Sequence, residues 1–171
     1  MFIRDWWINE RLHGITVTPL PVRSISAALT LGELRNQCLD GLTGVPKLVT
    51  PEEQEKWYCS WKPLEHLAYI YHDRGVRVGW SHILFKDGFA WPSLGVIPSE
   101  RRKGFGPQIV KHAMIAGGCE ALGLLLARNT AIHKIDFALG WEKVDEHWDD
   151  TINEMVFTVR YPWPPKFLLE G

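Results

Sequence analysis

The sequence predicts an α/β fold, layered as in α+β proteins, in which helices cover a sheet. Three observations predict it: strand-like runs and helical patterns are mixed along the chain, three consecutive runs form an antiparallel meander, and one helix begins with a complete capping signal. The chain has 171 residues, of which 46% are hydrophobic and 23% charged, as in ordinary folded proteins. A prior of about 150 residues per domain favours a single domain over residues 1–171.

The elements before the meander follow from local patterns. Residues 15–23 alternate and are β-branched, but two prolines make them an edge strand at best. Apolar residues at helical spacing predict a helix over residues 31–42. Thr50, followed directly by a proline and three residues later by Glu53, predicts the capping box of a helix that ends near Trp61.

The meander and the elements after it complete the expected order. Turns that contain glycine separate three strand-like runs, at residues 67–72, 76–85 and 89–97. We expect four further elements: a helix over 104–117, a buried strand over 122–127, a helix over 130–139 and a strand over 155–161. The Trp-rich residues 1–14 are interpreted as an N-terminal arm and residues 162–171 as a Pro-rich tail.

Composition argues against several classes of partner. The net charge is −1, with 19 Lys and Arg against 20 Asp and Glu, so nucleic acid is an unexpected partner. None of the three cysteines stands in a C-x-x-C pair, so we expect structural thiols and no metal. The N-terminal residues have no apolar core of a signal peptide, and the longest apolar run is too short to cross a bilayer. A cytoplasmic protein without membrane contact is the expectation.

The segment most informative about function joins the last strand of the meander to the next helix. Three cations, Arg101, Arg102 and Lys103, directly precede Gly104 and Gly106. Glycines let the backbone approach a ligand closely, and the N–H groups at a helix start are unpaired and carry partial positive charge. Together these features predict a seat for a pyrophosphate. The alternative is a tight turn with solvated charges.

At this loop the sequence resembles the GCN5-related N-acetyltransferase (GNAT) superfamily. Its acyl-CoA signature, [QR]-x-x-G-x-[GA] after a V-x-P-like step, is matched by Val96-Ile97-Pro98 and by Arg101-Arg102-Lys103-Gly104-Phe105-Gly106. A second feature, an Asn followed by a helix that ends in Leu-Gly-aromatic, is matched by Asn129 and by Leu139-Gly140-Trp141. The resemblance covers roughly residues 15–161. It implies an acyl-CoA N-acyltransferase fold with a central mixed, mostly antiparallel sheet flanked by helices.

The resemblance also implies where acetyl-CoA, the acyl donor, would bind. The fourth and fifth strands would part to admit the pantetheine arm, and the backbone near Leu94 and Val96 would pair with it. The amides from Arg102 to Gly106 would hold the pyrophosphate, and Asn129 would help to fix the pantetheine. The expected cofactor-binding residues are therefore Leu94, Val96, Arg101, Arg102, Lys103, Gly104, Phe105, Gly106 and Asn129.

The catalytic groups depart from the family pattern. The usual general acid is a Tyr seven residues after the Asn, and Asp136 occupies that position. A carboxylate with an ordinary pKa donates protons poorly to a thiolate at neutral pH, whereas His133, one turn earlier, has a better intrinsic pKa. We take both as catalytic candidates, the alternative being an exposed helix pair. The common Glu base is missing, so His82 is a further candidate base, and a base acting through water or catalysis by positioning alone stays open. Pro92 and Ser93 are expected to mark a bulge where the strands part.

The expected function is acetyl-CoA-dependent N-acetylation of a primary amine in a small molecule, an amino sugar or a protein. Residues 142–154 hold six acidic residues against one lysine. In the fold that the resemblance implies, they would form the hairpin near the acceptor entrance, an acidic rim that would favour a cationic amine unless it is only a solvated loop. The alternative function is a catalytically silent GNAT-fold structural or interaction protein, such as a phage virion component, that docks through the arm and tail. A nucleobase modifier is disfavoured because the chain lacks a basic face. Homodimerisation stays open.

Overall fold

A computed structural model describes residues 14–43, 47–62 and 64–169. Within this part a seven-stranded sheet has the order β1-β2-β3-β4-β5-β7-β6, and all neighbours are antiparallel except the parallel pair β4 and β5. The strands are β1 (Thr18–Pro21), β2 (His66–Asp73), β3 (Val76–Lys86), β4 (Phe89–Val96), β5 (Ala121–Leu126), β6 (Glu142–Asp149) and β7 (Glu154–Tyr161). The expected mixed, mostly antiparallel sheet is confirmed.

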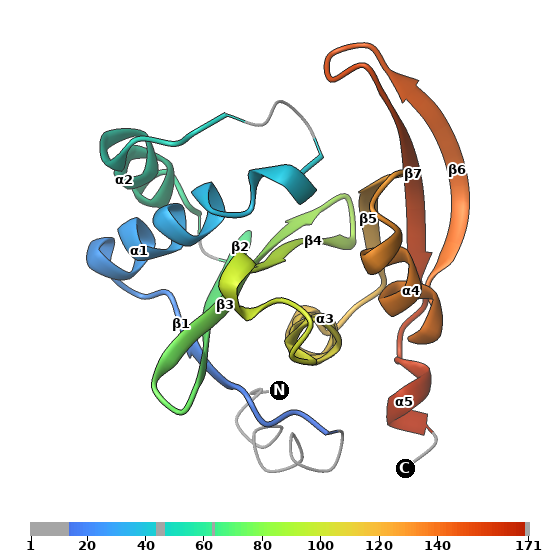
Figure 1. Cartoon of the computed structure of the whole chain (residues 1–171), viewed down its shortest axis with the longest axis horizontal. Helices are drawn as coiled ribbons and strands as arrows, with labels where there is room; N and C mark the ends of the chain where they lie inside the picture. Colours follow the sequence, from blue (N-terminus) through green and yellow to red (C-terminus); the bar gives the residue numbers. More distant parts are fainter. Residues whose placement is uncertain (1–13, 44–46, 63, 170–171) are drawn as a thin grey trace.

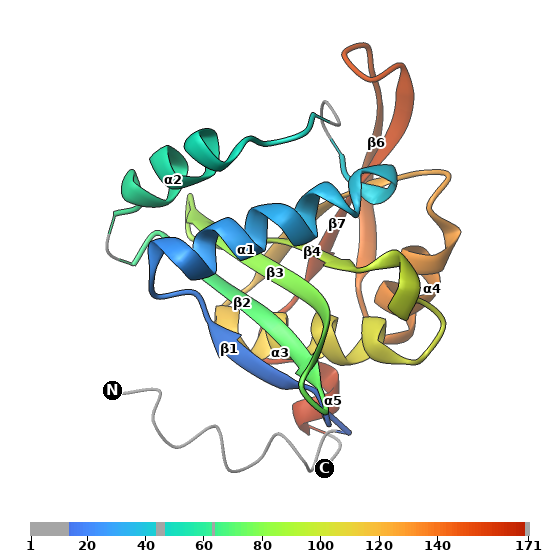
Figure 2. The same ribbon diagram turned by 60° about the vertical axis from the view of Figure 1, so that its left-hand side comes forward.

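Helices lie on both faces of this sheet (Figures 1 and 2). They are α1 (Ile25–Asn36), α2 (Pro51–Cys59), α3 (Phe105–Gly117), α4 (Thr130–Ala138) and α5 (Lys166–Leu169), with 3-10 turns η3 (Leu39–Gly41) and η4 (Pro98–Glu100). The helices α1 and α2 cover one face of β2–β4, whereas α3 packs on the other face and reaches α4 beside β5. The β6–β7 hairpin extends well beyond the rest of the molecule (Figure 1).

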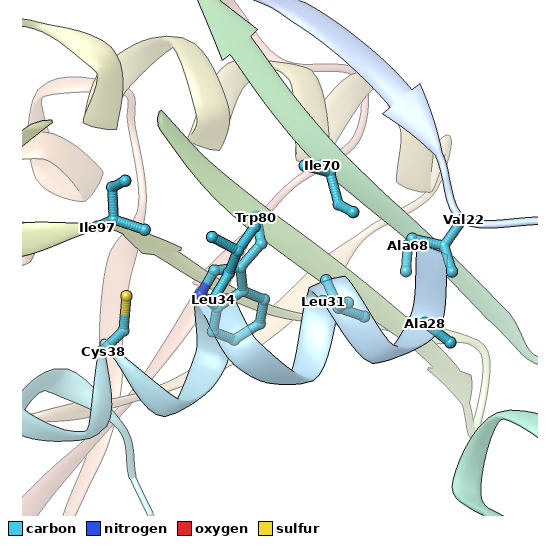
Figure 3. Packing of buried hydrophobic residues seen from close by; sticks show 9 residues of the cluster. All are labelled: Val22, Ala28, Leu31, Leu34, Cys38, Ala68, Ile70, Trp80 and Ile97. Atoms are coloured by element: carbon cyan, nitrogen blue, oxygen red, sulfur yellow. The ribbon is translucent and has the colours of Figure 1, made fainter. Parts of the chain in front are cut away.

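The helix α1 begins six residues before the expected start, which corrects the prediction of a helix over 31–42. The Ser24 side chain accepts a hydrogen bond from the Ala27 N–H and caps the helix. The apolar spacing still marks the buried face, because α1 packs against the sheet in a nine-residue cluster that includes Leu31, Leu34 and Trp80 (Figure 3). The chain after Asn36 continues into η3, so the pattern correctly placed Cys38 on the core but not the end of the helix.

Two further elements, β6 and α5, were absent from the order that the residue pattern predicts, although the resemblance implied a hairpin over residues 142–154. The strand β6 is exposed along nearly its whole length and acidic, so it shows no strand-like alternation, and its pairing with β7 holds it in the sheet. The short helix α5 lies in the expected Pro-rich tail, where Pro165 is fully buried and the Lys166 N–H donates to the Tyr161 hydroxyl. The expected arm, residues 1–14, lies outside the described residues except for Gly14.

The sheet divides between β4 and β5. These strands share a single ladder pair among the described residues, Ala90 with Ala121. The register of β3 and β4 runs without interruption past Pro92, so the bulge expected there is wrong. Pro92 nevertheless suits this strand, because a proline has no N–H to donate and β4 has little ladder to form on its β5 side. The divergence creates the opening described next.

Candidate active-site cleft

A cavity of about 740 Å³ occupies the gap where β4 and β5 diverge. One wall comes from β4 and β5, another from the facing sides of α3 and α4, and the third from residues 38–43 around η3. Most of the lining is apolar, with polar groups at Asn129 and Asp136 and charges at the end near η4. A long ligand could therefore pass between the two strands with one charged end near the start of α3.

The loop before α3 has the backbone of an anion site. Arg102 and Gly104 both adopt left-handed conformations, with φ of 65° and 84°, directly before the first helical residue, Phe105. No side chain caps this helix end, so the N–H groups of the first turn remain available to a ligand. Alternating left-handed residues followed by a helix N-terminus form a concave group of backbone N–H donors. Both Arg102 and Gly104 line the cavity.

The cations of this loop differ in what they contact. The Arg101 guanidinium donates to both carboxylate oxygens of Asp40, at 2.6 and 2.8 Å, and its Nε donates to the Val96 carbonyl at 3.2 Å. These contacts hold the pKa of Asp40 below its usual value. Lys103 pairs with Glu100 at 2.8 Å, while Arg102 is exposed and makes no ion pair within the described chain. The Arg101 side chain thus fixes the loop to η3.

The two glycines of the loop serve different purposes. A Cβ added to Gly104 would meet nothing within 4 Å, so the left-handed backbone is what requires glycine there. A Cβ added to Gly106 would lie 2.9 Å from Ile135 Cδ1, so this glycine permits the close approach of α3 to α4. Phe105 is buried against Ile109 in the core beneath α3 and anchors the turn.

The other expected cofactor residues also border the cavity. Leu94 and Val96 lie on β4 beyond Ala90, where the edge facing β5 has no ladder partner among the described residues. The Val96 carbonyl already accepts hydrogen bonds from Arg101 and from the Cys38 thiol. Asn129 caps α4, with its Oδ1 accepting from the Ile132 N–H at 3.4 Å.

Asp136 is buried in the wall of this cavity. It is 4% exposed, and its carboxyl has no hydrogen-bond or ion-pair partner within the described ranges. Burial raises the pKa of Asp136 to about 7, because the charged form is poorly solvated there. The alternative of an exposed helix pair is therefore wrong. The ordinary carboxylate pKa assumed from the sequence is wrong as well.

The other two catalytic candidates, His133 and His82, lie outside the cavity. His133 is also buried, but it packs between Phe137 and Phe157, its Nε2 donates to the Leu126 carbonyl at 2.9 Å, and it does not line the cavity. His82 lies on the α2 side of β3, where its Nε2 is 2.9 Å from His66 Nδ1. Burial lowers the pKa of His82 to about 4, so the ring is neutral at neutral pH. It too lies outside the cavity lining.

The sequence analysis missed the contribution of η3. Cys38, Asp40 and Gly41 line the cavity opposite α3 and α4. Arg128, at the end of β5, donates to the Asp40 carbonyl at 3.1 Å and pairs with Glu154 at 2.7 Å. Only the three-dimensional return of the chain brings this segment over the gap, and no local pattern around Asp40 indicates it. Within the described ranges no group of three metal-ligating side chains occurs, and no helix is long and apolar enough to span a membrane.

A seven-stranded sheet that divides beside a glycine-rich helix start is the fold of the GNAT acetyltransferases, and this chain has that fold. Spermidine N-acetyltransferase from Vibrio cholerae, solved with CoA and spermine, superposes with a TM-score of 0.75 at 12% identity over 89% of this chain and 98% of that one. A GNAT-family acetyltransferase from Streptococcus pneumoniae gives a TM-score of 0.70 at 14% identity over 85% and 98%.

A third structure, yncA from Salmonella typhimurium with its cofactor acetyl-CoA, gives a TM-score of 0.68 at 12% identity over 85% of this chain and 94% of that one. No protein-family model matches the sequence, and no curated protein matches it. The similarity therefore resides in the fold.

Proposed function

We propose that the protein is an N-acetyltransferase that takes acetyl-CoA as acyl donor and a primary amine as acceptor. The observation that carries this proposal is the open gap between β4 and β5, which ends at the left-handed turn before α3. A pantetheine arm is long and mostly apolar, and it carries a pyrophosphate at one end. The gap offers an unpaired strand edge and an apolar lining, and the turn offers backbone donors for an anion.

In this proposal the expected cofactor residues divide into two groups. The amides from Arg102 to Gly106 hold the pyrophosphate, and the strand edge at Leu94 and Val96 together with Asn129 holds the pantetheine. Arg101 supports the loop through Asp40 and does not use its charge on the ligand. Two of the similar structures were solved with CoA or acetyl-CoA, which supports this choice of donor.

For the acceptor we propose a cationic amine. The strand β6 is exposed and carries Glu142, Asp145 and Glu146, of which Glu146 pairs with Lys143 at 2.7 Å. An acidic strand attracts cations and raises their local concentration. One structural relative was solved with spermine, a polyamine, which gives a first acceptor to test. Small amines, amino sugars and protein amines all belong in the same test.

Calorimetric titration of the purified protein with acetyl-CoA and with free CoA tests the donor site. We expect both to bind at micromolar concentration, and the protein to release CoA when acetyl-CoA and an amine are both present. Spermidine, glucosamine and a lysine peptide sample the acceptor classes. Absence of binding by a folded protein would refute the proposal and favour a structural role of the fold. Binding without turnover on any acceptor would refute the enzymatic part alone.

A further inference from the structure

A short segment, residues 39–43, closes the end of the cleft where β4 and β5 diverge, and we call it the strap. It contains η3, and its residues Asp40 and Gly41 line the cavity opposite α3 and α4. The Asp40 carboxylate accepts two hydrogen bonds from Arg101, in the loop after β4. The Asp40 carbonyl accepts a hydrogen bond from Arg128, after β5, at 3.1 Å. The strap therefore joins the ends of the two diverging strands.

Exposed contacts hold the strap in place. None of the residues of η3 is buried, and the side chains of Asp40 and Arg101 are 60% and 38% exposed. Ion pairs at such exposure contribute little to stability, so this one can break and re-form without unfolding of the domain. By contrast, Cys38, the residue before η3, is buried in the core beneath α1. The strap is thus a weakly held segment next to a firmly anchored residue.

Release of Asp40 would leave both arginines in place. Arg101 also donates to the Val96 carbonyl at 3.2 Å, and Arg128 pairs with Glu154 at 2.7 Å. Neither of these contacts involves the strap. The two sides of the cleft would therefore keep their positions, and only the strap would have to move.

We propose that Asp40 is a positioning residue that latches the strap, and that this latch opens each time acyl-CoA enters the cleft or CoA leaves it. This role rests on the proposed function. A pantetheine arm that pairs with the β4 edge at Leu94 and Val96 lies along a cavity that the strap closes. Sideways entry into such a cavity requires the strap to release. End-on entry, with the acyl group first, would leave the latch closed, so the two routes predict different kinetics.

Stopped-flow mixing of the full-length protein with CoA measures the rate constants of association and dissociation. Trp91 and Trp141 line the cavity, so intrinsic tryptophan fluorescence serves as the signal. The test variant Asp40→Asn removes the charge and keeps the size of the side chain, and Asp40→Glu restores the carboxylate. The matched control is Asp87→Asn, which changes an exposed carboxylate that lies 4.0 Å from Lys86 and outside the cavity lining.

We expect Asp40→Asn to raise the association and dissociation rate constants together by about fivefold, because the exposed ion pair adds to the barrier for both entry and exit. The Kd for CoA should therefore stay within about twofold of wild type. Asp40→Glu and Asp87→Asn should keep the wild-type rate constants. Loss of a residue that only stabilised the bound state would raise the dissociation rate constant alone.

Unchanged rate constants in Asp40→Asn would overturn the proposal and favour end-on entry. Faster dissociation with unchanged association would overturn it as well, because Asp40 would then act only on the bound state. Absence of CoA binding by the folded wild-type protein is a different result: it would refute the proposed function, and the role of Asp40 with it.

Discussion

At the scale of single residues, Gly104 combines a left-handed backbone with a place in the proposed pyrophosphate site. Its φ of 84° places it in the left-handed region, and a side chain there would project into open space at the mouth of the cleft. Gly75, in the turn between β2 and β3, has nearly the same φ of 82° and the same open surroundings. Both glycines therefore carry the same backbone constraint, whereas of the two only Gly104 lines the cleft, which makes them a matched pair.

We predict that Gly104→Trp abolishes CoA binding while the chain still folds. The indole would occupy the space above the N–H donors of the loop, and the left-handed backbone would cost about 1–2 kcal/mol. The variant Gly75→Trp carries the same backbone cost, so it should match Gly104→Trp in urea midpoint and bind CoA like wild type. Calorimetry and denaturation check both. Equal CoA affinity in the two variants would contradict the placement of the pyrophosphate.

Asp136 gives a second residue-scale prediction, on stability. Its pKa is about 7 when folded and near 3.8 when unfolded, so the unfolded chain releases the proton first as pH rises. The free energy of unfolding therefore falls between pH 4 and 7 by about 1.4 kcal/mol per pH unit, then levels off. We predict that Asp136→Asn gains stability relative to wild type over this range. Urea denaturation from pH 4 to 8 measures the difference, and a flat difference would contradict a buried acid.

At the scale of elements, α2 is joined to the sheet through aromatic rings. Trp57 contacts His82 edge-on, and Trp61 stacks on both His66 and His82. Burial lowers the pKa of His82 to about 4, so the packed form is the neutral one. The unfolded chain takes up this proton near pH 6.5, and the folded chain does so only near pH 4. Acid therefore weakens this packing.

We predict that the unfolding free energy loses about 1.4 kcal/mol per pH unit through His82 as pH falls from 6.5 to 4. His112, whose pKa burial also lowers to about 4, adds a similar loss, and Asp136 opposes both. The variant His82→Asn isolates the contribution of His82, because the stability of this variant relative to wild type should rise steadily as pH falls. A constant difference over that range would show that the ring titrates normally in the folded protein.

The capping box of α2 supplies a local test. The Thr50 hydroxyl accepts from the Glu53 N–H, and the Glu53 carboxylate accepts from the Thr50 N–H at 3.0 Å. We predict that Thr50→Ala lowers the unfolding free energy by about 1 kcal/mol, because the Glu53 N–H loses its acceptor, the Thr50 hydroxyl. Thr151→Ala, in the exposed β6–β7 turn, should change it by less than about 0.5 kcal/mol. Urea denaturation measures both, and equal effects would contradict the cap.

The sequence predicted those parts of this protein that have a local cause. The Thr50 cap, the meander and the glycine loop before α3 each depend on a few neighbouring residues. The residue pattern did not indicate the acidic strand β6, because its pairing with β7 determines it, and only the family resemblance implied a hairpin there. The raised pKa of Asp136 could not be predicted from the sequence, because it results from burial among apolar residues of distant elements. The role of Asp40 could not be predicted either, because it depends on contacts with Arg101 and Arg128, which are distant in the sequence.

At the scale of the whole molecule, the sheet consists of two halves, β1–β4 and β5–β7. They share the Ala90–Ala121 ladder pair and the packing of α3. We predict that CoA, lying between the halves, slows hydrogen exchange at β4 beyond Ala90 and at the start of α3 together. Exchange along β2 and β3 should change little. Mass-resolved exchange with and without CoA measures this, and protection at only one of these two segments, or equal protection along β2 and β3, would contradict binding in the gap.

The position of Asp40 affects the width of the cleft between β4 and β5. The Asp40 side chain holds the loop after β4, and its carbonyl holds Arg128 at the end of β5. The short turn η3 therefore connects the two sides of the cleft, the loop after β4 and the end of β5, and sets the distance between them. Its own position depends on how α1 rests on the sheet, through contacts such as Leu34 with Trp80. Substitutions in the core beneath α1 would therefore change the width of the gap between β4 and β5. They would alter the affinity for CoA without changing any residue that contacts it.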